Sequence, residues 1–112
     1  MKSEKKIDID KVLGDIFKEY RLKNNLTQEK IAEKLGISVK YISRIENGTG
    51  GVKVETLVNY MNILGISPNV IFEKLIVNDD LKPQMQLSKK ASRLPDDKIN
   101  FVISVIDLLE NL

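Results

Sequence analysis

The sequence contains no cysteine, no histidine and no tryptophan. Without cysteine there is no disulfide and no thiol nucleophile, and without histidine as well there is no zinc site of sulfur and imidazole ligands. Histidine is also the commonest general acid or base, so catalysis would have to rely on carboxylates, lysines and hydroxyls. No phosphate-binding or nucleophile-elbow motif organises such groups here. These absences argue against an enzyme, and we expect neither a metal nor another cofactor.

Long apolar runs are missing as well. Residues 1–11 are charged and lack the apolar centre of a signal peptide, and no run approaches the roughly 18 residues of a membrane helix. A chain of 112 residues, 42% hydrophobic and 30% charged, is typical of one globular domain with a small appendage. The net charge of +2 is too small to identify a partner. We therefore expect a cytoplasmic protein without a membrane partner.

Apolar residues recur at helical spacing along most of the chain. Residues that favour helix starts and ends separate the apolar stripes: Asn24 with Asn25, Thr27, Gly36, Ser38, Asn47 with Gly48, Gly65, and Ser67 with Pro68. This pattern of helix starts and ends predicts an all-α bundle of five short helices over residues 9–76. Residues 78–80 are typical of a linker, and helices opening near Pro83 and Pro95 follow. We expect residues 77–112 to form a C-terminal helical extension.

Residues 26–48, LTQEKIAEKLGISVKYISRIENG, place a short helix, a glycine turn and a second helix at fixed offsets. Ala32 is small where the two helices would cross, and Gly36 stands where the turn requires a left-handed backbone. The apolar residues that would fix the crossing are Ile31, Leu35, Ile37, Ile42 and Ile45. This pattern predicts a helix-turn-helix whose second helix, residues 38–47, enters the DNA major groove.

Together with Arg21 and the later segment LVNYMNILGISP, these motifs resemble the phage repressor and Cro-like family, also called XRE-type helix-turn-helix regulators, over about residues 12–75. The resemblance implies a repressor-like DNA-binding bundle and a sequence-specific transcriptional regulator, more often a repressor than an activator. Many relatives place a proline and more basic residues after the recognition helix. This chain has TGGVKVE instead, which leaves Lys53 as the one cation of that loop.

The resemblance also implies roles for individual residues. The positions that match base-reading residues are Val39, Lys40, Ser43 and Arg44. The positions that match phosphate contacts are Thr27, Gln28, Ser38, Tyr41, Asn47 and Lys53. Arg21 and Glu46 match an ion pair that ties the first helix to the third. The alternatives are solvated surface charges for Lys40 and Arg44, an exposed valine without a role for Val39, and a cover of the bundle for Tyr41.

The last helix is unusually apolar, since nine of the fourteen residues 99–112 are apolar. A surface helix needs only one apolar face, so we predict a homodimer interface at Ile99, Val102, Ile103, Ile106 and Leu109. The alternative is a helix buried in its own chain. One module on one half-site rarely binds tightly, which favours a dimer that reads a palindromic operator in double-stranded DNA.

A different class of function stays open. In it the C-terminal helices bind a second protein, as in an antitoxin, while the helix-turn-helix autoregulates its own operon. A ligand sensor is less well supported, because the C-terminal extension is too short to enclose a sizeable pocket.

Overall fold

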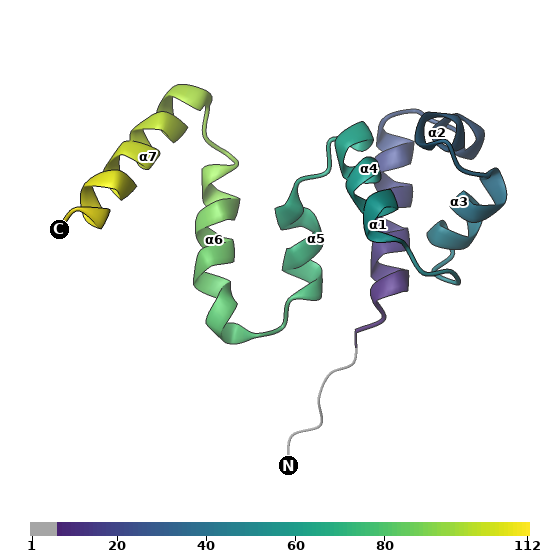
Figure 1. Cartoon of the computed structure of the whole chain (residues 1–112), viewed down its shortest axis with the longest axis horizontal. Coiled ribbons are helices and arrows are strands. Elements are labelled where there is room, and N and C mark those ends of the chain that lie inside the picture. The colour runs from purple at the N-terminus through teal and green to yellow at the C-terminus, as the bar shows by residue number, and fades with distance from the viewer. Residues whose placement is uncertain (1–6) are drawn as a thin grey trace, which may run out of the picture. The chain divides into compact units, whose positions relative to one another are not determined.

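The structure, a computed structural model, describes residues 7–112, and the regular structure of that part is entirely helical (Figure 1). Its elements are α1 (Ile9–Lys23), α2 (Gln28–Leu35), α3 (Val39–Glu46), α4 (Val54–Leu64), α5 (Pro68–Leu75), the 3₁₀ turn η1 (Asp79–Leu81), α6 (Lys82–Ala91) and α7 (Asp96–Glu110). The predicted all-α class is confirmed. Among the helices described, none combines the length and the apolar character needed to cross a bilayer.

Local sequence sets the helix ends. Thr27 and Ser38 accept hydrogen bonds from backbone N–H groups of the first turns of α2 and α3, and Ser67 does the same for α5. Gly36 and Gly65 end α2 and α4 in the left-handed conformation, both with φ of 68°. The caps read from the sequence therefore mark helix ends in the structure.

The chain forms two compact units, of which the first ends at Val77. In the first unit α1 packs against α3, α4 and α5, and α2 packs against α3 and α4. At its centre the rings of Phe17 and Tyr60 stack with centroids 4.0 Å apart, and neither side chain is exposed. The other buried apolar residues are Leu13, Ile16, Ile31, Ala32, Ile42, Ile45, Leu64, Ile66 and Ile71. This core fixes α3 rigidly against α1.

Gly14 lets α1 and α3 approach closely. A Cβ atom at this position would overlap the carbonyl oxygen of Ile45 and would lie 2.9 Å from that of Glu46. Both atoms belong to the backbone at the end of α3, so the contact has little room to relax. Glycine in mid-helix is usually unfavourable, and here the close approach explains it.

The second unit, Asn78–Leu112, contains η1, α6 and α7 and has no fully buried residue in these elements. The residues predicted as a linker, 78–80, lie at the start of this second unit, and Asp79–Leu81 forms a 3₁₀ turn there. In this turn the Asn78 side chain accepts a hydrogen bond from Asp80 N, and Lys82 pairs with Asp79 at 2.6 Å. Along α7, Phe101 and Leu108 are about 70% and 69% exposed.

Candidate nucleic-acid interface

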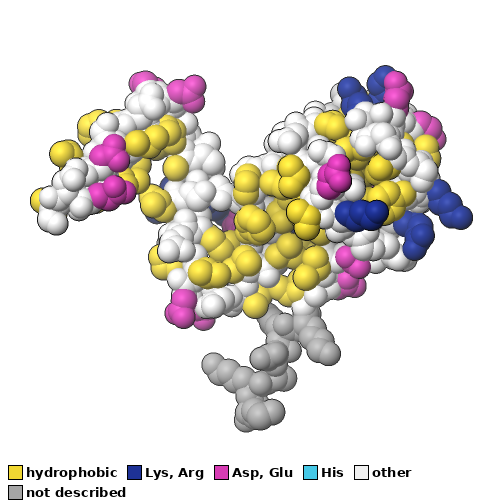
Figure 2. All heavy atoms as spheres, viewed as in Figure 1, with side chains coloured by type: hydrophobic (Ala, Val, Ile, Leu, Met, Phe, Trp, Pro, Cys, Tyr) yellow, Lys and Arg dark blue, Asp and Glu magenta, His cyan; other side chains and the backbone are white. Residues whose placement is uncertain are grey.

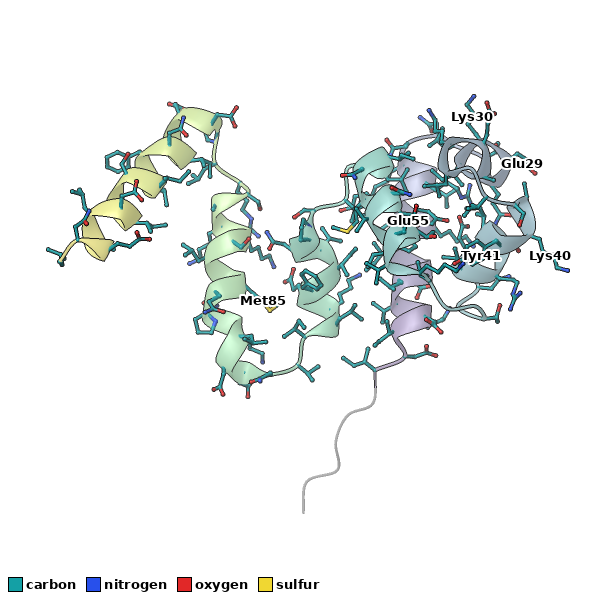
Figure 3. The ribbon with its side chains drawn as sticks, viewed as in Figure 1. Glu29, Lys30, Lys40, Tyr41, Glu55 and Met85 are labelled. Carbon is teal, nitrogen blue, oxygen red and sulfur yellow. The ribbon has the colours of Figure 1, made fainter. Side chains whose placement is uncertain are left out.

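Helix α3 has one buried face and one open face. Ile42 and Ile45 are completely buried, whereas Lys40 and Arg44 are exposed. Lys40 points away from the bundle (Figure 3). The remaining predicted base-reading residues lie on the open side, with Val39 exposed and Ser43 half-buried. The structure thus gathers all four on one accessible side of α3.

The N-terminal ends of α2 and α3 expose hydroxyl groups. Thr27 Oγ1 accepts from Lys30 N at 3.0 Å, and Ser38 Oγ accepts from Tyr41 N at 3.1 Å. In each bond the hydroxyl acts as the acceptor, so its own proton is available to a further acceptor. Helix N-termini also attract anions through their N–H groups and dipole. Both ends are therefore chemically suited to hold a phosphate.

A buried ion pair joins α1 to the end of α3. Arg21 Nε donates to Glu46 Oε2 at 2.7 Å and Arg21 Nη2 donates to Glu46 Oε1 at 3.0 Å. Arg21 Nη1 also donates to the carbonyl oxygen of Leu26 at 2.7 Å. The hydrogen bond to Glu46 raises the pKa of Arg21 above its ordinary value, against the opposing effect of burial. The pair is bidentate, and it clamps the α1–α2 turn as well as α3.

Gln28 extends this network to α2. Its Nε2 donates to Glu46 Oε1 at 3.2 Å, so one carboxylate links side chains from α1 and α2 to α3. An amide nitrogen carries two protons, and the second remains available for a phosphate. Sequence reasoning missed this link. Gln28 and Glu46 are 18 positions apart and no spacing rule connects them.

Tyr41 holds the loop that follows α3. Its hydroxyl donates to the carbonyl oxygen of Gly51 at 3.2 Å. A phenol has a single proton, so a phosphate contact made as a donor would have to replace this bond. Asn47 at the end of α3 and Lys53 at the start of α4 are exposed. Lys and Arg side chains stand out along the α2 and α3 side of the first unit (Figure 2).

Comparison with known proteins identifies the family of this chain. The helix-turn-helix family pattern matches residues 17–71. The chain is 34% identical to the control protein C.SmaI of Serratia marcescens over 76 residues. This match covers 68% of this chain and 86% of the Serratia protein. The chain belongs to the XRE-type helix-turn-helix family. An XRE-type regulator of this kind binds DNA and controls transcription.

Solved structures of similar proteins agree with this assignment. The XRE-type chain matches the wild-type restriction-modification controller protein C.Esp1396I with a TM-score of 0.52 and 32% identity, over 62% of this chain and 88% of that one. It matches the clp gene regulator ClgR from C. glutamicum with a TM-score of 0.56 and 27% identity, over 66% and 95% of the two chains. By their descriptions these relatives are control, controller and regulator proteins.

Proposed function

We propose that this XRE-type regulator is a repressor that binds a palindromic operator as a homodimer, with α3 of each subunit in the major groove. The observation that carries the proposal is the division of α3 between a completely buried face and an open polar face. A short helix fixed in this way presents its outer side chains without further folding. A dimer bound over a promoter represses by occupying a site that polymerase needs.

Four side chains of α3 are proposed to read bases. Lys40 and Arg44 are suited to the O6 and N7 acceptors of guanine, and an arginine can contact both at once. Val39 is suited to a thymine methyl group, and the Ser43 hydroxyl can donate or accept. Their positions on the open side of α3 support a joint role.

Phosphate contacts are proposed around the two helix N-termini and the loop. Thr27 and Gln28 flank the start of α2, and Ser38 caps α3. Asn47, Lys53 and, in exchange for its bond to Gly51, Tyr41 complete the set. Contacts of this type orient the protein on the duplex and carry no base information.

The dimer is proposed to form through the C-terminal extension, residues 77–112, with α7 packed against its copy. Among the proposed contact residues, Ile103 and Leu109 are 49% and 61% exposed, and Ile106 is 37% exposed. Ile99 and Val102 are half-buried. A second copy of the chain is the simplest occupant, because a two-fold dimer matches a palindromic operator and buries the same face twice.

Selection of bound sequences from a random DNA pool tests this function. We expect an inverted repeat whose half-sites lie about one helical turn, or a multiple of it, apart. Light scattering on the same sample should give the mass of a dimer. A single unrepeated half-site bound by a monomer would contradict the proposal. A defined second protein bound stoichiometrically to residues 77–112 in place of the copy would favour the antitoxin-like alternative.

A further inference from the structure

The loop of residues 48–51 is anchored to two helices. Gly48 adopts a φ of +70°, and a Cβ there would lie 2.9 Å from Lys11 Cα, so the loop backbone sits directly on α1. Thr49 donates from its backbone N and its Oγ1 to the carbonyl oxygen of Arg44, at 3.0 and 3.3 Å. Tyr41 holds the other end through Gly51 at 3.2 Å. The loop is therefore a fixed part of the α3 surface.

The side chain of Arg44 lies along this loop. A Cβ atom at Gly50 would stand 3.4 Å from Arg44 Cβ, 3.5 Å from its Nε and 3.8 Å from its Nη2. These are contact distances, so a larger side chain at Gly50 would compete with the guanidinium for space. At Gly51 an added Cβ would meet nothing within 4 Å. A side chain added at Gly50 would therefore contact Arg44, whereas one added at Gly51 would begin in open space.

We propose that the 48–51 loop is a specificity-determining positioning element, in which the bare backbone of Gly50 sets the direction of the Arg44 guanidinium. Bidentate readout of guanine depends on the plane of the guanidinium fork, so its direction decides whether one base pair is discriminated. Tyr41 acts on the same readout through the loop. This inference rests on the proposed base-reading role of Arg44.

The experiment measures the binding of variants to a matched set of operators that differ at the base pair assigned to Arg44. Arg44→Ala should lower the preference at that base pair by roughly 5- to 100-fold. Gly50→Val should lower the same preference by roughly 3- to 10-fold, and Gly50→Ala by less, since its Cβ only touches Arg44. Gly51→Val is the control, because a Cβ there would meet nothing within 4 Å and the carbonyl oxygen that accepts from Tyr41 is retained; it should leave the preference unchanged.

A double-mutant cycle separates positioning from a general effect on the loop. In the Arg44→Ala background, Gly50→Val should change the preference by less than about twofold. An equal effect of Gly50→Val with and without Arg44, or an equal loss on all sequences, would overturn the inference. Neither Gly50 nor Gly51 has a positive φ, so both accept a side chain without backbone strain.

Tyr41→Phe gives a second, independent variant that leaves Gly50 unchanged. Loss of its bond to Gly51 should lower the preference at the same base pair, and only while Arg44 is present. The preference is a ratio of affinities for two operators, so a loss of phosphate affinity that is equal for both cancels. If Arg44→Ala leaves base selection unchanged, the proposed base-reading role fails and the inference fails with it. If Arg44→Ala relaxes selection while Gly50→Val and Tyr41→Phe do not, the inference alone is wrong.

Discussion

Gln28 at the start of α2 donates a hydrogen bond to Glu46 at the end of α3, 3.2 Å away, and the same carboxylate holds Arg21 of α1. The residue proposed to contact a phosphate is thus fixed by the residue that closes the recognition helix. Folding and DNA contact share one carboxylate, and variants of this cluster can separate the two contributions.

Loss of one partner of the buried pair should destabilise the protein. Arg21→Ala leaves Glu46, whose side chain is 2% exposed, as an uncompensated buried charge, so the free energy of unfolding should fall by about 3 kcal/mol. Urea denaturation followed by circular dichroism measures this. The double variant Arg21→Met with Glu46→Leu removes both charges and should recover most of the stability. No recovery in the double variant would contradict this view of the pair.

The same double variant tests the role of Gln28. Without Glu46 the amide of Gln28 loses its acceptor, so affinity should fall about equally on specific and random DNA. Gln28→Ala in the wild-type background should give a loss of the same kind, and adding it to the double variant should change little. A change in base preference would show instead that the carboxylate acts on readout. Fluorescence anisotropy with both DNAs distinguishes these results.

Tyr60 should make stability depend on alkaline pH. Its hydroxyl is buried without a hydrogen-bond partner among the described residues, and burial raises its pKa well above the ordinary value. Above the unfolded pKa of about 10, Tyr60 ionises in the unfolded chain but not in the folded one. The free energy of unfolding is therefore unaffected by this titration below that pH and falls as the pH rises beyond it. Tyr60→Phe should add about 1 kcal/mol to the free energy of unfolding at neutral pH.

Urea denaturation at neutral pH and above pH 10 compares the two proteins. The gain of Tyr60→Phe over the wild type should widen at the higher pH, because the variant lacks the ionising group. Other groups titrate in both proteins and cancel in the difference. A constant difference across the two conditions would show that Tyr60 does not carry the effect.

Gly14→Ala should destabilise the first unit although alanine favours helices. The new Cβ would overlap the carbonyl oxygen of Ile45, and separating α1 from α3 should lower the free energy of unfolding by about 2 kcal/mol. Gly51→Ala adds the same atom in open space and serves as the control. A thermal melt in which Gly14→Ala is more stable than the wild type would contradict the close approach.

Lys53→Ala should weaken binding without changing the preferred sequence. If Lys53 contacts only a phosphate, its removal should lower the number of counterions released on binding by about one. Lys40→Ala, which removes the same charge from the open face of α3, should relax selection at one base pair by about 1–3 kcal/mol. Titrations at several salt concentrations and sequence selection check both. If Lys53→Ala changed only the preferred sequence, the assignment of Lys53 to a phosphate contact would be wrong.

Ile106→Asp should yield a folded monomer if α7 packs against its copy. A half-site reader released from its partner should bind the full palindrome roughly 100- to 10,000-fold more weakly. Asn100→Asp, which adds the same charge at an exposed polar position of α7, should remain a dimer. Light scattering gives the mass and circular dichroism the fold. An Ile106→Asp protein that unfolds, or that stays dimeric, would contradict the interface.

The sequence predicts those features that depend on neighbouring residues. Caps such as Thr27, Ser38 and Gly36 act within a few positions, so the helix ends were open to prediction. The link between Gln28 and Glu46 depends on how separate helices meet, which no local pattern encodes. The role of Gly50 beside Arg44 depends likewise on a loop conformation in space. Arg21 and Glu46 could be paired in advance only through the family resemblance.

The recognition helix has only eight residues, and three of them, Ile42, Ile45 and Glu46, are buried in the first unit. An isolated helix of this length is unstable in water, so α3 exists only while that core is intact. The amide protons within its hydrogen-bonded turns should therefore exchange with solvent mainly through global opening of the first unit, whereas the free N–H groups of its first turn should exchange directly. The lifetime of the surface that reads DNA is consequently tied to that of the folded domain.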